Sequence, residues 1–166
     1  MENIILTGMP GCGKSTVGVV LAKNLGYNFV DTDLLISREA DKPLQRIIDE
    51  EGIERFESLE TYVGENLKCN KTVVATGGSM VLCEKAMKNL KSLGKVVYIK
   101  VSIEELERRL GNFSTRGIVM KKGQTIRDIY NMRKEYYEKY ADVVLEEKSN
   151  SKMGDNIDEL IKLLNN

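Results

Sequence analysis

The stretch "IILTGMPGCGKSTVG", residues 4–18, decides the fold of this chain. A short apolar run ends in a glycine-rich loop, and a helical pattern follows at once. The segment Gly8-x4-Gly13-Lys14-Ser15 matches G-x-x-x-x-G-K-[ST], in which glycines let backbone N–H groups surround phosphates. The start of the helix adds partial positive charge. The stretch therefore predicts a nucleotide-phosphate site between a strand and a helix.

The loop pattern assigns a role to each side chain in this site. Lys14 is expected to reach the β- and γ-phosphates of ATP, and Ser15 to bind Mg²⁺. The other residues expected to contact the nucleotide are Gly8, Gly11, Cys12, Gly13 and Thr16. The alternative is a glycine-rich turn that holds no nucleotide.

Composition limits the possible classes of protein. The 166 residues fit a single domain over 1–166, and 25 basic residues balance 25 acidic ones, which argues against a nucleic-acid partner. No apolar run approaches the roughly 18 residues that span a bilayer. Three cysteines without metal spacing read as free thiols, and we expect a cytoplasmic monomer. Because histidine is absent, proton transfer must use a carboxylate, a lysine or the substrate.

Short apolar runs alternate with longer helical patterns along the whole chain. We expect strands at 4–7, 28–31, 72–75, 95–101 and 142–146. Helices are expected at 14–25, 82–93, 102–110, 126–140 and 155–164, and between 34 and 68 with breaks near 41–43 and at 52. This alternation predicts a three-layer α/β fold with a parallel sheet, whose ligands bind beyond the carboxyl ends of the strands. The glycine-rich segment 111–125 is expected to be a mobile lid.

The predicted class is a small kinase. A GTPase would need Asn-Lys-x-Asp after a strand, and the one Asn-Lys pair continues as Thr-Val. At the end of the second strand, Asp31 and Asp33 suit two tasks: one holds Mg²⁺ through water, and the other binds the acceptor hydroxyl and accepts its proton. The alternative is that Asp33 caps the next helix while Asp31 is solvated.

Further candidate contacts come from glycine and arginine positions. "TGGS", residues 76–79, offers unhindered backbone N–H groups at a third strand end, although a plain strand–helix turn has the same composition. Arg116 in the lid is placed to close over the γ-phosphate, Arg109 to stack on adenine, and Arg133 to clamp an anion. The alternative for each is a solvated surface arginine.

The chain as a whole resembles the shikimate kinase family of P-loop proteins. The matching segments are "GMPGCGKSTVG", "LAKNLGYNFVDTD", "ATGG", "TRGIV" and "RKEYYEKYAD", in the family's order. The resemblance implies the strand order 2-3-1-4-5 and ATP-dependent phosphorylation of the 3-hydroxyl of shikimate. The roles that it implies are Mg²⁺ binding for Asp31, acceptor-hydroxyl binding for Asp33, substrate contacts for Gly77 and Gly78, the lid arginine for Arg116, adenine stacking for Arg109, and carboxylate binding for Arg133.

Three positions depart from the family's pattern. In "RFESLE", residues 55–60, Glu57 stands where the family usually has an arginine that grips the substrate carboxylate, whereas Glu60 keeps the family's glutamate. Ser79 replaces a third glycine, and Gly117 replaces a proline. Glu57 and Ser79 are therefore expected at the acceptor side. Two alternative functions therefore stay open. One is a kinase for gluconate, another polyol acid or an amino alcohol, and the other is a non-catalytic nucleotide-binding module.

Overall fold

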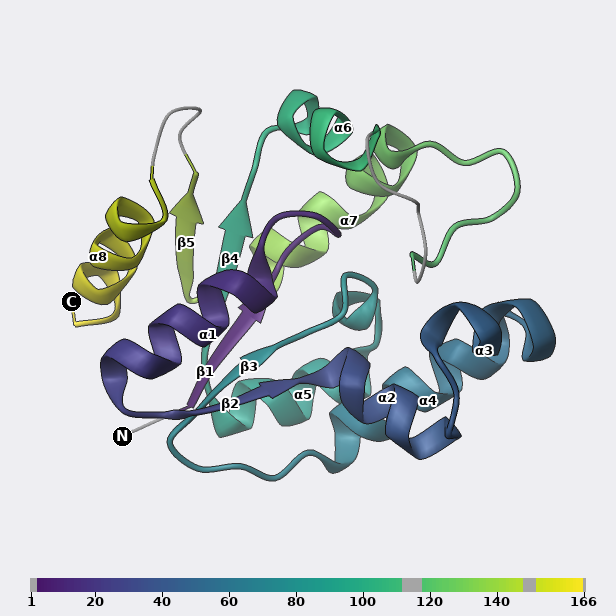
Figure 1. Ribbon diagram of the computed structural model, residues 1–166, viewed down its shortest axis with the longest axis horizontal. Coiled ribbons are helices and arrows are strands. Elements are labelled where there is room, and N and C mark those ends of the chain that lie inside the picture. Colours follow the sequence, from purple (N-terminus) through teal and green to yellow (C-terminus); the bar gives the residue numbers. More distant parts are fainter. Residues whose placement is uncertain (1–2, 112–117, 148–151, 166) are drawn as a thin grey trace.

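The computed structural model describes residues 3–111, 118–147 and 152–165, which build a five-stranded parallel sheet (Figure 1). Every neighbouring pair of strands is parallel, and the order is β2-β3-β1-β4-β5. This arrangement confirms the expected fold class and strand order. The strands are β1 (Asn3–Thr7), β2 (Asn28–Asp31), β3 (Thr72–Ala75), β4 (Gly94–Lys100) and β5 (Val143–Glu146).

Eight α-helices and one short 3₁₀ turn connect and cover the described strands. They are α1 (Lys14–Leu25), α2 (Thr32–Ala40), α3 (Leu44–Glu51), α4 (Ile53–Asn66), the 3₁₀ turn η1 (Met80–Leu82), α5 (Glu84–Leu93), α6 (Ile103–Gly111), α7 (Ile126–Tyr140) and α8 (Met153–Leu164). The predicted breaks near residues 41–43 and at Gly52 are confirmed, and they separate α2, α3 and α4.

The central strand β1 sends alternate side chains into two apolar cores. Ile4 and Leu6 lie in a cluster with residues of α1, α7 and α8, whereas Ile5 lies in a cluster with residues of α5. All three side chains are almost fully buried. A sheet covered on both faces explains why β1 is an unbroken apolar run.

Two local signals set the ends of helices beside the site. Gly26 ends α1 in a left-handed conformation, with φ of 65°. At the start of α2, the side chain of Asp31 accepts a hydrogen bond from the backbone N–H of Asp33. The capping residue is thus Asp31, and the alternative in which Asp33 caps this helix is wrong.

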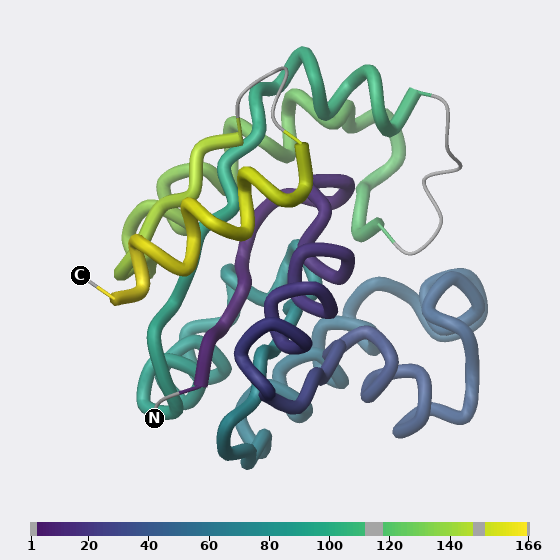
Figure 2. The backbone as a smooth tube through the Cα atoms, turned by 60° about the vertical axis from the view of Figure 1, so that its left-hand side comes forward, coloured from purple at the N-terminus to yellow at the C-terminus, as the bar shows by residue number. Residues whose placement is uncertain are grey.

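Helices α2, α3 and α4 form a separate lobe beside the carboxyl ends of β2 and β3 (Figure 2). Their inward faces build a third apolar cluster that includes Ile36, Ile47 and Phe56. The lobe holds two acidic helical positions, Asp33 and Glu60, on the side of the strand ends. The predicted lid at 111–125 lies partly outside the described residues, because only 118–125 of its loop are described.

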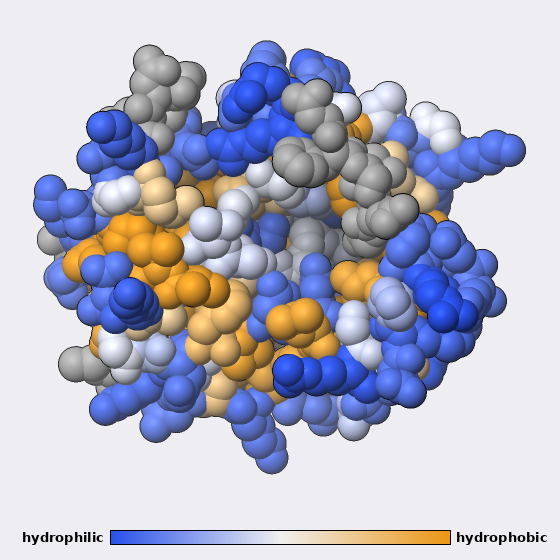
Figure 3. Space-filling model, viewed as in Figure 1, coloured by the Kyte–Doolittle hydropathy of each residue, from blue (hydrophilic) through white to orange (hydrophobic). Residues whose placement is uncertain are grey.

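The space-filling view shows hydrophilic residues around most of the periphery of this face, with hydrophobic residues grouped toward the left and the lower middle (Figure 3). None of the helices in the described ranges is long and apolar enough to cross a membrane.

Candidate active site

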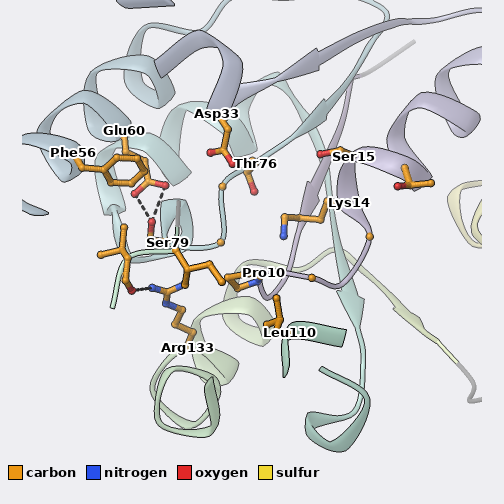
Figure 4. Close-up of a pocket in the computed structure, with 17 residues that line it drawn as sticks. Pro10, Lys14, Ser15, Asp33, Phe56, Glu60, Thr76, Ser79, Leu110 and Arg133 are labelled. Carbon is orange, nitrogen blue, oxygen red and sulfur yellow. Dashed lines mark hydrogen bonds between the residues drawn. The ribbon is translucent and has the colours of Figure 1, made fainter. Parts of the chain in front are cut away.

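A cavity of about 340 Å³ lies beyond the carboxyl ends of β1, β2 and β3 (Figure 4). One side is the phosphate loop, and the other side combines α2, α4, α7 and the segment after β3. The predicted convergence of three strand ends is therefore confirmed. The cavity is lined by Pro10, Gly11, Gly13, Lys14, Ser15, Thr16, Asp33, Phe56, Glu60, Thr76, Gly77, Gly78, Ser79, Leu110, Ile118, Val119 and Arg133.

The phosphate loop takes the conformation that its glycines permit. Gly11 and Gly13 have φ of 79° and 89°, values that disfavour residues with a Cβ. The Nζ atom of Lys14 lies over the loop and donates to the carbonyl oxygens of Gly8 and Met9, at 2.8 and 2.9 Å. The loop thus holds a buried ammonium group at the start of α1, which is the charge distribution that binds phosphate.

The two predicted metal ligands lie together. Ser15 begins the first turn of α1, and its hydroxyl donates to Oδ2 of Asp31 at 2.7 Å. Mg²⁺ prefers oxygen ligands and is usually held by one or two protein groups together with phosphate oxygens and water. This hydroxyl–carboxylate pair beside the phosphate loop fits such an ion.

The side of the cavity opposite the phosphate loop, formed by α2, α4, α7 and the segment after β3, is called the acceptor half. In this half, two carboxyl groups flank Gly77. A Cβ built on Gly77 would lie 2.8 Å from Oδ1 of Asp33 and 2.9 Å from Oε1 of Glu60. A side chain at this position would displace one or both acids, so glycine permits the close approach of Asp33 and Glu60. The backbone N–H of Gly77 donates to the hydroxyl of Thr32 at 3.0 Å, which ties β3 to α2.

The acceptor half also rests on the phosphate loop. A Cβ on Gly78 would lie 2.7 Å from Cδ of Pro10, and the carbonyl oxygen of Gly78 accepts a hydrogen bond from the hydroxyl of Tyr137 at 2.5 Å. Two residues to which the sequence analysis gave no role, Thr32 and Tyr137, therefore hold the glycines of the acceptor half, and the hydroxyl of Tyr137 also lies 3.9 Å from Sδ of Met9 in the phosphate loop. The signal for Tyr137 was its place four residues after Arg133, one helical turn along the same face.

Arg133 places its guanidinium group in the cavity. Among the described residues that line the acceptor half, it is the one with a cationic side chain. Its side chain is 1 % exposed, and one terminal nitrogen donates to the carbonyl oxygen of Val119 at 3.2 Å. The Nε atom is buried and has no hydrogen-bond partner among the described residues. A buried guanidinium with a free donor is an unusual and unfavourable arrangement that an anionic ligand would complete.

Burial changes the acidity of both carboxyl groups that line the cavity. Burial, reinforced by the negative charge of Asp31, raises the pKa of Asp33 to about 6 although Lys14 opposes the shift. Burial also raises the pKa of Glu60 to about 7, opposed mainly by a hydrogen bond from Ser79. Such acids at the strand ends are suited to receive protons from hydroxyl groups.

The structure does not bring every predicted residue into the cavity. Glu57 is exposed and does not line the cavity. Gly8 and Cys12 belong to the phosphate loop but do not line the cavity either, and the side chain of Cys12 is fully buried. Arg109 lies beside the loop, donating to the carbonyl oxygen of Gly11 at 3.2 Å, and pairs with two glutamates, Glu105 and Glu147. Adenine stacking by Arg109 stays a prediction. Arg116 and Gly117 lie outside the described residues.

One cavity that joins a phosphate loop to an acid-lined acceptor wall defines a P-loop kinase that acts on a small molecule. Comparison with known proteins identifies the family. The family model described as shikimate kinase matches residues 10–165. The chain therefore belongs to the shikimate kinase family, and it is a phosphotransferase with a hydroxyl group as acceptor. Membership of this family supports the predicted cofactors, ATP and Mg²⁺.

Individual relatives agree with this assignment. A shikimate kinase of Clostridium botulinum (strain Okra) is 39% identical over 150 residues, which cover 87% of each chain. The solved structure of shikimate kinase from Acinetobacter baumannii in complex with shikimate has a TM-score of 0.89 at 30% identity, covering 98% of this chain and 92% of that one. A gluconokinase from Sinorhizobium meliloti has a TM-score of 0.61 at 19% identity, with 99% and 91% covered, and shares the fold alone.

Proposed function

We propose that this chain transfers the γ-phosphoryl group of ATP to the 3-hydroxyl of shikimate. The observation that carries the choice of acceptor is Arg133, whose buried Nε has no hydrogen-bond partner among the described residues. The other charged groups that line the acceptor half of the cavity are the carboxyl groups of Asp33 and Glu60. A carboxylate on the acceptor supplies the missing charge and the missing hydrogen bond. Shikimate combines one carboxylate with several hydroxyl groups, and the hydroxyls match Asp33 and Glu60.

In the proposed reaction, each described group has a task that its position supports. The backbone of the phosphate loop and the ammonium group of Lys14 bind and orient the phosphates. Asp33 holds the acceptor hydroxyl and accepts its proton as the new bond to phosphorus forms. Ser15 and Asp31 would hold Mg²⁺, which when bound would neutralise negative charge on the phosphate oxygens.

The surroundings of the cavity complete the proposal. Leu110, Ile118 and Val119 also line the cavity, so apolar groups exclude water from this part of it. We propose that Arg116, from the segment between them, acts as the lid arginine over the transferring phosphoryl group. We also propose one catalytic domain over 1–166, with a lid at about 111–125, that acts as a cytoplasmic monomer.

An acceptor screen tests the proposal. ADP release is measured in a coupled assay with ATP, Mg²⁺ and one acceptor at a time: shikimate, gluconate, a polyol acid or an amino alcohol. We expect saturable turnover with shikimate at a kcat/KM at least 100-fold above that for the other acceptors. Turnover with gluconate or an amino alcohol alone would overturn the choice of acceptor. Tight ATP binding without turnover on any acceptor would favour the non-catalytic module.

A further inference from the structure

Ser79 makes the closest polar contact to Glu60 in the acceptor half. Its Oγ atom lies 2.9 Å from Oε1 and 2.7 Å from Oε2 of Glu60, and it donates to the carboxyl group (Figure 4). Ser79 is 7% exposed and Glu60 is 2% exposed, yet both line the cavity. The carboxyl group of Glu60 is therefore presented to an acceptor rather than to solvent.

The charge of Glu60 is balanced between opposing influences. Burial is the largest influence and raises its pKa, and the carboxylates of Asp33 on α2 and Glu57 on its own helix act in the same direction. The hydrogen bond from Ser79 and the positive charge of Arg133 on α7 lower the pKa. Because the result lies at about 7, one hydrogen bond decides how much of Glu60 is ionised near neutral pH.

We infer that Ser79 is a positioning residue for acceptor recognition: its hydroxyl keeps Glu60 ionised and aimed into the cavity, where Glu60 accepts a hydrogen bond from a second hydroxyl of the acceptor. The inference deepens the proposed function and rests on it. It also relates two of the three departures from the family's pattern, Glu57 and Ser79, to the same carboxyl group. The negative charge of Glu57 disfavours the ionised form of Glu60, and the hydroxyl of Ser79 restores it.

The test compares pH profiles of kcat/KM for shikimate in the wild type, Ser79→Ala and Ser79→Gly. If loss of the hydroxyl raises the pKa of Glu60 by about one unit, kcat/KM falls about ninefold at pH 6, about fivefold at pH 7 and less than about twofold at pH 9. The defect should appear in KM for shikimate, whereas KM for ATP stays unchanged. Ser79→Thr, which keeps a hydroxyl, should retain the wild-type profile.

Ser92→Ala is the matched control. Its hydroxyl donates to the carbonyl oxygen of Asn89 at an exposed position on α5, beside the amino end of β4. This variant should match the wild type at every pH. A defect of Ser79→Ala that is equal at pH 6 and pH 9, no defect at all, or a threonine variant that behaves like alanine would each overturn the inference.

A measurement without substrate separates this inference from the proposed function. The carboxyl ¹³C resonance of Glu60, assigned with Glu60→Gln, is titrated by NMR in the full chain. We expect its pKa to be higher in Ser79→Ala than in the wild type. An unchanged pKa overturns the inference whatever the acceptor is. A raised pKa in a protein that does not phosphorylate shikimate refutes the proposed function and leaves the link between Ser79 and Glu60 standing.

Discussion

Replacing Arg133 with methionine should separate acceptor binding from stability. In the folded protein this guanidinium is desolvated, its Nε has no hydrogen-bond partner among the described residues, and a terminal nitrogen donates to the carbonyl oxygen of Val119 at 3.2 Å. Losing a hydrogen bond from a charged group costs about 1.5–3 kcal/mol, and an unsatisfied buried donor costs about 1–3 kcal/mol. The two contributions oppose each other, so Arg133→Met should change the free energy of unfolding by no more than about 2 kcal/mol in either direction.

The same substitution should affect acceptor binding far more. Removing one partner of a buried, hydrogen-bonded charge pair weakens binding by about 2–5 kcal/mol. This corresponds to a loss of about 30-fold to several-thousand-fold in kcat/KM for shikimate. KM for ATP should not change, because Arg133 lies on the acceptor side of the cavity. Coupled ADP-release kinetics and urea unfolding of the same preparations provide the two measurements.

Arg127→Met on the same helix is the matched control. Arg127 is half exposed and pairs with Glu107 on the surface, so its loss should alter neither kcat/KM nor stability measurably. The reasoning would be refuted if Arg133→Met kept kcat/KM for shikimate within threefold of the wild type. It would also be refuted if an acceptor without the carboxylate lost as much activity as shikimate does.

Four further changes test individual contacts. Asp33→Asn should lower kcat by about 10²–10⁴-fold with ATP binding intact in a fluorescent-nucleotide assay, and an unchanged kcat would contradict its role as base. Gly77→Ala should displace the carboxyl groups of Asp33 and Glu60, destabilise the fold by about 1–3 kcal/mol in urea unfolding and raise KM for shikimate; a wild-type KM would contradict this. Tyr137→Phe leaves the half-buried carbonyl of Gly78 without its donor, and should destabilise the protein by about 1 kcal/mol; an unchanged urea midpoint would contradict this. Glu60→Gln should raise the thermal midpoint at pH 8 more than at pH 5. A carboxyl whose pKa is raised from 4.5 to about 7 destabilises the folded state progressively as the pH rises between these two values, and fully above them; equal shifts at both pH values would argue against this.

Local patterns in the sequence were sufficient to predict the fold. Four helices and strands occur with the predicted bounds, because each is delimited by a glycine, a capping residue or a change of periodicity: Lys14–Leu25, Asn28–Asp31, Thr72–Ala75 and Ile126–Tyr140. The bounds were less accurate where tertiary contacts decide them. The helix predicted from residue 82 begins at Glu84, because Met80–Leu82 tighten into a 3₁₀ turn below the glycines of the site.

The nucleotide half of the site was more predictable than the acceptor half. The phosphate loop is contiguous in sequence, so its spacing alone places Lys14 and Ser15. The acceptor half joins residues from α2, α4, α7 and the end of β3, and no spacing in the sequence specifies which of them meet. Glu57 shows the difficulty: Phe56 and Glu60 are four residues apart and share the buried face of α4, whereas Glu57 is turned about 100° from Phe56 and is exposed.

The two glycines of the acceptor half are held in place by uncharged side chains, one of which belongs to the phosphate loop. Gly78 packs against Pro10 of the phosphate loop, and its carbonyl is fixed by Tyr137. Gly77 is fixed by Thr32 on the other side. A shift of either glycine would therefore move the acceptor relative to the phosphates, and in-line transfer is sensitive to such displacements. The requirement for glycine at 77 and 78 thus comes from neighbouring atoms and not from a left-handed backbone, since neither residue has a positive φ. The fourth position after β3 holds Ser79, whose side chain fits beside Glu60 and can act on it.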